Sequence, residues 1–364
     1  MDYLRYYLGA VIVGTGIFGF ALGGNWAWLG IATYLPLAMA DLLLPADLAP
    51  RRVTSPALAD LPLYLHGALM IVLFMSVVVW APGIDLGAGI AAGTAILGAI
   101  VSLAWLGAVP NLPVNHELMH RRSAFARGLA SFLGTFYGDP SRDLAHVHEH
   151  HLLLGTELDG DTARRGDTIY NFALRCAKGA AIEGWRIEVT RLAKQGLGPW
   201  TPHNRVVRGY LGIAATIVLA GILGGPVAAL TIGGGIVASR ILVEAFNYYQ
   251  HYGLVRVVGT PYDRRHLWNH LTPVSRMLGF EITNHSDHHV DPYMPYYALR
   301  PHTEGPQMPS IFVCFLSGII PPIWFRFIAK PRLEEWDLHF ASDEERRLAA
   351  EANRRAGWPD WFPA

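Results

Sequence analysis

Long apolar runs constrain this chain more than any other feature. Six of them occur in three closely spaced pairs, at about residues 4–23, 26–44, 61–80, 86–109, 209–223 and 227–246. Short turns separate the members of each pair; the first is Gly24-Asn25, which favours a tight reversal. Because roughly 20 apolar residues span the hydrocarbon core of a bilayer, the sequence predicts six transmembrane helices arranged as three hairpins.

The composition agrees with this interpretation. Only 16% of the 364 residues are charged, whereas about 25% is usual in a soluble globular protein. The formal net charge is zero, so nothing in the charge balance indicates a nucleic-acid partner. We therefore expect a single membrane domain over residues 1–364, surrounded by the lipid bilayer.

The arginines predict an orientation. The three hairpin turns contain no Lys or Arg, whereas the opposite ends of the runs are flanked by residues such as Arg5, Arg51 and Arg52. Under the positive-inside rule these flanks and both termini are expected to be cytoplasmic. The expected location is a bacterial inner membrane. The polar segments 111–208 and 247–364 then form a cytoplasmic helical cap.

One more apolar segment, 310–328, contains Pro321-Pro322 and Arg326. A proline pair interrupts a helix, so this segment is predicted to be interfacial or re-entrant instead of spanning. The expected fold class is therefore an all-α integral membrane protein, with about six transmembrane helices and a cap.

Nine of the sixteen histidines form four groups in the predicted cap. On a helix, residues at i, i+3 and i+4 share a face, so His285, His288 and His289 would converge in the last group. His148 points away from the face that its neighbours share and is left out. The nine candidates for metal ligands are His116, His120, His146, His150, His151, His251, His285, His288 and His289.

The size of this set indicates the kind of site. A structural zinc ion closes at four ligands, so nine neutral nitrogen donors suggest two metal ions of intermediate softness, and iron fits that description. The chain has two cysteines, Cys176 and Cys314, whereas an iron–sulfur cluster takes about four thiolates. Any electron-transfer cluster is therefore expected on a partner protein.

Neutral ligands leave the charge of the metal uncompensated, so nearby carboxylates are expected to accept the second N–H of the imidazoles. The main candidates are Glu117, Glu244 and Asp287, and further candidates are Glu149, Asp159 and Asp161. A carboxylate near lipid is costly and is by default functional, which singles out Glu244. Trp105 lies three turns before His116 and is a candidate wall of the substrate pocket, although a packed bundle tryptophan explains it as well.

Two other functions compete with this interpretation. His116-Glu117-Leu118-Met119-His120 matches the zinc-protease pattern with Glu117 as the general base, but a protease leaves the other groups unexplained. A metal transporter agrees less well with the sequence, because transport sites lie near the bilayer midplane, whereas these histidines lie outside the apolar runs.

The complete set of motifs resembles a known family. The boxes HELMH, HVHEHH and HSDHH, together with NYYQHYGLVR, are similar to those of the membrane-bound histidine-rich non-heme di-iron family of alkane hydroxylases and fatty-acid desaturases. Landmarks from MDYLRYYL to AKPRLEEWD resemble its branch of xylene and toluene side-chain monooxygenases. The resemblance therefore covers nearly the whole chain.

The resemblance implies an activity. Two irons held by the nine histidines would activate O₂ and hydroxylate a methyl group of a hydrophobic alkylbenzene to the benzylic alcohol. Electrons would come from NADH through FAD and a [2Fe–2S] cluster on a separate reductase. An alkane terminal hydroxylase or an acyl desaturase of the same family is the alternative, and an intramembrane zinc metalloprotease is a remote one.

Overall fold

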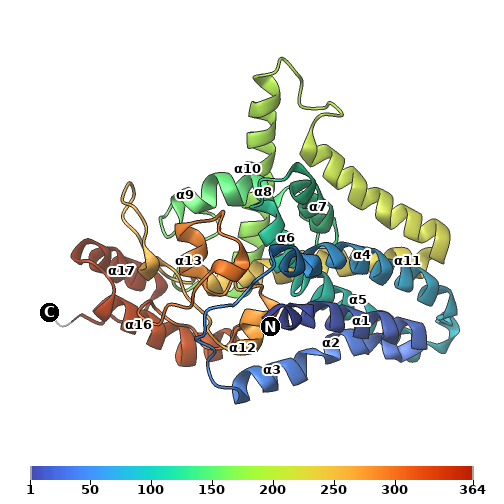
Figure 1. The fold of residues 1–364 in the computed structure, drawn as a ribbon, viewed down its shortest axis with the longest axis horizontal. Coiled ribbons are helices and arrows are strands. Elements are labelled where there is room, and N and C mark those ends of the chain that lie inside the picture. The colour runs from blue at the N-terminus through green and yellow to red at the C-terminus, as the bar shows by residue number, and fades with distance from the viewer. Residues whose placement is uncertain (1, 363–364) are drawn as a thin grey trace.

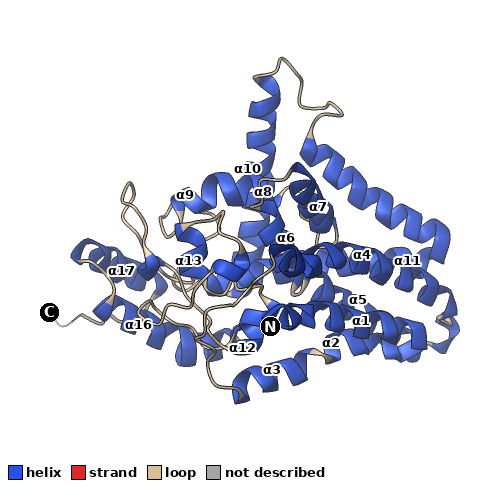
Figure 2. Cartoon of the chain, in the orientation of Figure 1, coloured by secondary structure: helices blue, strands red, loops and turns tan. Residues whose placement is uncertain are grey.

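The computed structural model describes residues 2–362, which are mainly helical (Figure 1). Figure 2 shows helices joined by loops, and within the described residues the β pairing is confined to an isolated bridge between Asn269 and Gln307. Long helices lie side by side at one end of the molecule, and short helices and loops make up the other end.

The bundle at the first end consists of α1 (Leu8–Leu22), α2 (Leu29–Ala32), α3 (Tyr34–Leu43), α4 (Pro56–Trp80), α5 (Ile90–Ala108) and α11 (Arg205–His251). Five helical stretches are long and apolar enough to cross a membrane: Asp2–Leu22, Gly24–Leu43, Pro56–Gly83, Ile90–Met119 and Arg205–His251. Large apolar side chains such as Phe18, Val79 and Ile222 are more than half exposed. An exposed apolar surface of this kind is typical of contact with lipid.

The last of these stretches contains both members of the third predicted hairpin. Gly225 has φ 77° and ψ −176°, a non-helical conformation that reverses the chain between two helical arms. Figure 1 shows the two arms of α11 diverging from this bend. Such backbone angles are essentially restricted to glycine, so a single residue determines the hairpin.

The other end carries the histidines. The helices outside the bundle are α6 (Asn111–Met119), α7 (Ala124–Thr135), α8 (Arg142–Ala145), the π-helix His146–His150, α9 (His151–Leu153), α10 (Ile169–Ala193), α12 (Pro273–Leu278), α13 (His285–Val290), α14 (Ile311–Gly318), α15 (Pro321–Trp324), α16 (Lys330–His339) and α17 (Asp343–Ala356). The long helix α10 projects from the molecule (Figure 1). The segment 310–328 breaks before Pro321 and is not among the five candidate spans in the described chain.

A buried carboxylate holds the turn that precedes α13. Glu281 has a left-handed backbone, with φ 59°, which costs an L-residue about 1 kcal/mol or more. Its side chain accepts hydrogen bonds from Tyr6 Oη (2.6 Å), Arg51 Nε (2.5 Å) and Arg276 Nε (2.6 Å). A buried charge is tolerated when it is paired and hydrogen-bonded in this way. The turn that leads into His285 is thus tied to the N-terminal helices.

Replacing Gly225 by alanine tests the reversal. Gly225→Ala should lower the free energy of unfolding by about 1 to 3 kcal/mol, because a Cβ is strained at this backbone conformation. The matched control is Gly212→Ala in the first arm of α11, where a Cβ would meet no atom within 4 Å. That change should be neutral or stabilising. Thermal unfolding in detergent measures the stability of both variants. Equal losses of stability would contradict the role of Gly225 in reversing the chain.

Candidate metal centre

The first pair of histidines is presented by α6. A turn that includes Pro110 separates the end of α5 from the start of α6. The Asn111 amide bridges this break by donating to the carbonyl oxygens of Gly107 and Leu133, both at 3.0 Å. One turn of α6 then separates His116 from His120, and the centroids of their rings are 4.7 Å apart.

The second group lies on a π-helix, whereas the sequence predicted an α-helix. His146–His150 forms the π-helical turn, whose i→i+5 hydrogen bonds make a wider turn of the kind found at functional sites. The rings of His146 and His151 are consequently 4.9 Å apart. The side chains of His148 and Glu149 lie outside the part of the chain that the structure describes.

The last two groups meet each other across the sequence. His251 is the final residue of α11, and His285 is the first residue of α13. Their Nε2 atoms are 3.0 Å apart. His289, one turn further along α13, stacks on His151 with a centroid distance of 4.3 Å.

The imidazoles gather into two adjacent groups. In each group the ring nitrogens lie within 4.8 Å of one another; the larger group contains His116, His120, His146, His151 and His288, and the smaller contains His150, His251 and His289. His285 adjoins the smaller group through His251. The four segments therefore meet in one place.

Many of these nitrogens face no protein partner. Both ring nitrogens of His120, His151 and His289 are buried without a hydrogen bond to the described residues. The Nε2 atoms of His116 and His146 face each other at 2.9 Å. An unsatisfied buried polar group costs about 1 to 3 kcal/mol, and a cation bound by these lone pairs would remove that cost. The donor set thus fits transition-metal ions.

The charge state of the rings supports metal binding. Burial lowers the pKa of His146, His151 and His288, and the neighbouring imidazoles lower it further. Burial also lowers the pKa of His120 to about 3. Neutral imidazoles, the form that binds metals, are therefore favoured at pH 7.

His150 differs from the others. Burial alone would lower its pKa, but the carboxylate of Asp159 outweighs that effect and raises it. His150 Nδ1 lies 2.9 Å from Asp159 Oδ2, and Asp159 also accepts a hydrogen bond from the hydroxyl of Thr162 at 2.6 Å. This contact holds the ring with Nε2 free, as the carboxylates around metal-binding histidines do.

The three main carboxylate candidates have other partners among the described residues. Glu117 pairs with Arg121 at 2.7 Å. Glu244 accepts from the Asn247 amide at 3.1 Å and also pairs with arginines. Asp287 binds His302 Nε2 at 2.9 Å and Arg264 at 3.1 Å. Their role at a metal stays a prediction.

The indole of Trp105 donates to the Thr33 hydroxyl at 3.0 Å and packs against Tyr34. Trp105 is fully buried, and its place in a substrate pocket stays a prediction.

Sequence reasoning gave no special role to His270, which is fully buried beside the site. Its Nδ1 donates to the carbonyl of Pro309 at 2.6 Å, and its Nε2 has no partner among the described residues. Burial lowers its pKa to about 4. A lone histidine carries no pattern that would have distinguished it from a surface residue.

Removing the Asp159 carboxylate tests its contact with His150. Asp159→Asn should weaken metal binding by about 10- to 100-fold, because the ring loses the acceptor that orients it. Metal titration of the purified protein measures this. Asp167→Asn is the matched control, because Asp167 pairs with Arg175 instead of an imidazole. Unchanged affinity in Asp159→Asn would contradict this role.

Acidification should destabilise the metal-free protein. Because the pKa values of His146, His151 and His288 lie below 6.5 in the folded state, the unfolded chain alone gains protons as the pH falls below 6.5. The contribution of these three residues to stability is thus present above pH 6.5 and is lost as the pH falls below it. Unfolding midpoints at about pH 7.5 and about pH 5.5 test this. The control is His203→Ala, at an exposed position, which should leave the pH dependence of the unfolding midpoint unchanged. Equal midpoints of the wild-type protein at the two pH values would contradict the prediction.

Comparisons with known proteins identify the family. The model for the fatty acid desaturase family matches residues 91–313, a range that contains all nine clustered histidines. The chain is 47% identical to the xylene/toluene monooxygenase hydroxylase component XylM of Pseudomonas putida, over 99% of this chain and 97% of the relative. It is 29% identical to alkane 1-monooxygenase 1 of Pseudomonas aeruginosa, over 91% and 88% of the two chains. This chain belongs to the fatty acid desaturase family, and within that family it is a membrane monooxygenase hydroxylase.

Proposed function

We propose that this protein is the di-iron hydroxylase component of a monooxygenase that converts a methyl group of an alkylbenzene, of the toluene or xylene type, into the benzylic alcohol. The observation that carries the proposal is the convergence of nine buried imidazoles in two adjacent groups. The 47% identity to a xylene/toluene monooxygenase component over nearly the whole chain supports the choice of substrate class.

The histidines of the larger group and those of the smaller group would each hold one iron, with His285 in the smaller group. When bound, the irons supply the activation of O₂. The protein contributes imidazole donors, and in two of them a hydrogen bond holds the other ring nitrogen in place. His150 Nδ1 donates to Asp159 at 2.9 Å, and His285 Nδ1 donates to the carbonyl of Ile282 at 3.2 Å. Both rings therefore present Nε2 to the site.

The reaction needs two electrons and two protons, because one oxygen atom of O₂ enters the alcohol and the other leaves as water. Both cysteines, Cys176 and Cys314, are buried. Two thiols are too few for an iron–sulfur cluster, which takes about four. The proposal accordingly assigns NADH, FAD and the [2Fe–2S] cluster to a separate reductase.

The apolar bundle suits a hydrophobic substrate that arrives from the bilayer. In the proposed arrangement the spans cross a bacterial inner membrane, with the histidine site and both termini on the cytoplasmic side, as the distribution of arginines favours. The aromatic side chains of Trp105, Tyr34 and Phe312 contact one another, with Trp105 and Phe312 buried and Tyr34 partly buried, and they are candidates for the wall of the substrate pocket.

Relatives named alkane 1-monooxygenase support the alternative of terminal alkane hydroxylation. Product analysis with toluene, p-cymene, octane and a fatty acyl substrate, in the presence of a suitable reductase, separates this alternative and a desaturase from the proposed activity. Metal analysis tests the remote alternative of a zinc protease, since such an enzyme would hold about one zinc instead of about two irons.

Loss of a single imidazole from either group should abolish hydroxylation and lower the iron content. His146→Ala removes a donor from the larger group, and His285→Ala removes the ring that faces His251. The control is His203→Ala, at an exposed position outside the site. Product formation and iron content measure the effect. Normal turnover in either variant would remove that residue from the proposed ligands.

A further inference from the structure

A basic pocket opens beside the larger histidine group. Its volume is about 610 Å³, and His120 lies in its wall. The charged residues of the lining are Arg121, Arg122, Arg127, Arg205 and Asp143. Four arginines thus face a single carboxylate at the edge of the site.

Two of these arginines have their charge balanced by carboxylates. Arg121 pairs with Asp60 and Glu117, and Arg205 pairs with Asp143. The other two, Arg122 and Arg127, are exposed and form no ion pair with the described residues. Arg127 donates to the carbonyl oxygen of Arg121 at 3.1 Å, and the Arg122 guanidinium lies over the ring of Tyr293, 5.9 Å from its centroid. The pocket therefore presents uncompensated positive charge to solvent.

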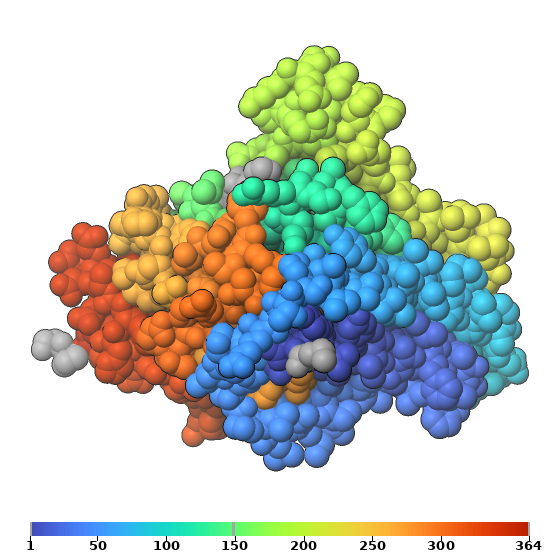
Figure 3. Space-filling model, viewed as in Figure 1, coloured from blue at the N-terminus to red at the C-terminus, as the bar shows by residue number. Residues whose placement is uncertain are grey.

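The lining also has the composition of a binding surface. Arg, Tyr and Met are enriched at protein interfaces, and Met119 and Tyr293 join the arginines in this pocket. Tyr293 is 58% exposed. Figure 3 shows the segment that contains Arg122 and Arg127 beside the segment around Tyr293 on one face of the molecule.

We propose that this pocket is the docking surface for an acidic electron-transfer protein, which delivers electrons to the metal site through His120. The inference rests on the proposed function, because hydroxylation consumes two electrons in each turnover, and these must be delivered from outside the chain. The [2Fe–2S] cluster of the partner is oxidised in two successive one-electron transfers, and these two electrons, with two protons, reduce one oxygen atom of O₂ to water while the other enters the C–H bond of the methyl group. Opposite charge guides such encounters and raises their rate.

A second pocket of similar volume is a less suitable surface for this partner. Asp159, the carboxylate that contacts His150, lies in its lining, but that lining contains equal numbers of arginines and acidic residues. It therefore offers no net attraction to an acidic protein. Anionic lipid headgroups would also bind exposed arginines, but the position of His120 in the first pocket favours an electron donor.

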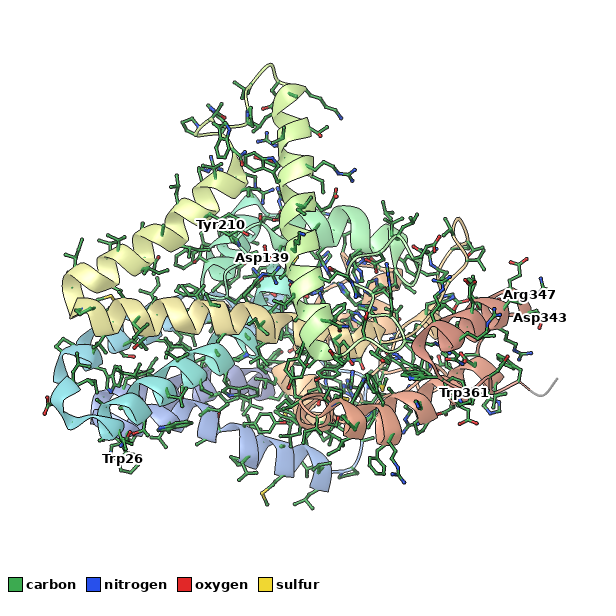
Figure 4. The ribbon with its side chains drawn as sticks, turned by 180° about the vertical axis from the view of Figure 1, so that it is seen from behind. Trp26, Asp139, Tyr210, Asp343, Arg347 and Trp361 are labelled. Carbon is green, nitrogen blue, oxygen red and sulfur yellow. The ribbon has the colours of Figure 1, made fainter. Side chains whose placement is uncertain are left out.

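Charge reversal at Arg122 tests the proposal. Full-length protein in phosphatidylcholine nanodiscs is assayed with a flavin and [2Fe–2S] reductase, and separately with dithionite, which needs no docking surface. The measured quantity is the ratio of reductase-driven to dithionite-driven product formation at low salt. Arg122→Glu should lower this ratio about tenfold and weaken its dependence on salt, whereas Arg122→Lys should retain it. Arg347→Glu is the matched control, because Arg347 is exposed on α17, at the far edge of the molecule (Figure 4).

The outcomes are distinguishable. An unchanged ratio in Arg122→Glu would overturn the docking surface while leaving the proposed hydroxylation intact. A ratio that falls only when the nanodiscs contain anionic lipid would assign these arginines to headgroups and would also overturn it. Wild-type protein that yields no alcohol with either reductant would overturn the proposed function itself, and the docking surface with it.

Discussion

The structure depends on the packing of nine imidazoles against one another, seven of which have a buried ring nitrogen without a hydrogen-bond partner among the described residues. Their nitrogens approach to 2.9 Å and 3.0 Å in the pairs His116–His146 and His251–His285. Buried ring nitrogens without a partner among the described residues, such as both nitrogens of His120, His151 and His289, raise the free energy of the fold, since each unsatisfied group costs about 1 to 3 kcal/mol. A cation shared by the rings reverses the sign of that contribution. The same contacts that destabilise the metal-free protein therefore form a donor set that fits a metal ion.

The backbone departs from ideal geometry at two places that bring these rings together. The π-helical turn at His146–His150 replaces α-helical hydrogen bonds, and Glu281 adopts a left-handed backbone next to α13. The second deviation is stabilised by the hydrogen bonds of Glu281 with Tyr6, Arg51 and Arg276. Departures from ideal geometry thus cluster around the site, as they do where function constrains a fold.

Two kinds of surface meet at the histidines. The bundle exposes large apolar side chains such as Phe18 and Ile222, which suits lipid and a hydrophobic substrate. The other end of the molecule exposes charge, including Arg122 and Arg127 beside His120. In the proposed function, the substrate reaches the site from the apolar bundle and the electrons reach it from the charged end. The two therefore use different surfaces of the molecule.

The sequence by itself determined the apolar runs, the four histidine groups and the resemblance to the family, because these depend on spacings within one helix or on residues close in the chain. Only the tertiary structure decided that His150 and His151 belong to different groups, and that Asp159 contacts an imidazole while Glu117, Glu244 and Asp287 have other partners. It also decided that Arg122 and Tyr293 form one pocket. Helical periodicity fixes the face on which a residue lies, but the partner of that face comes from a distant segment, and no local pattern encodes that choice.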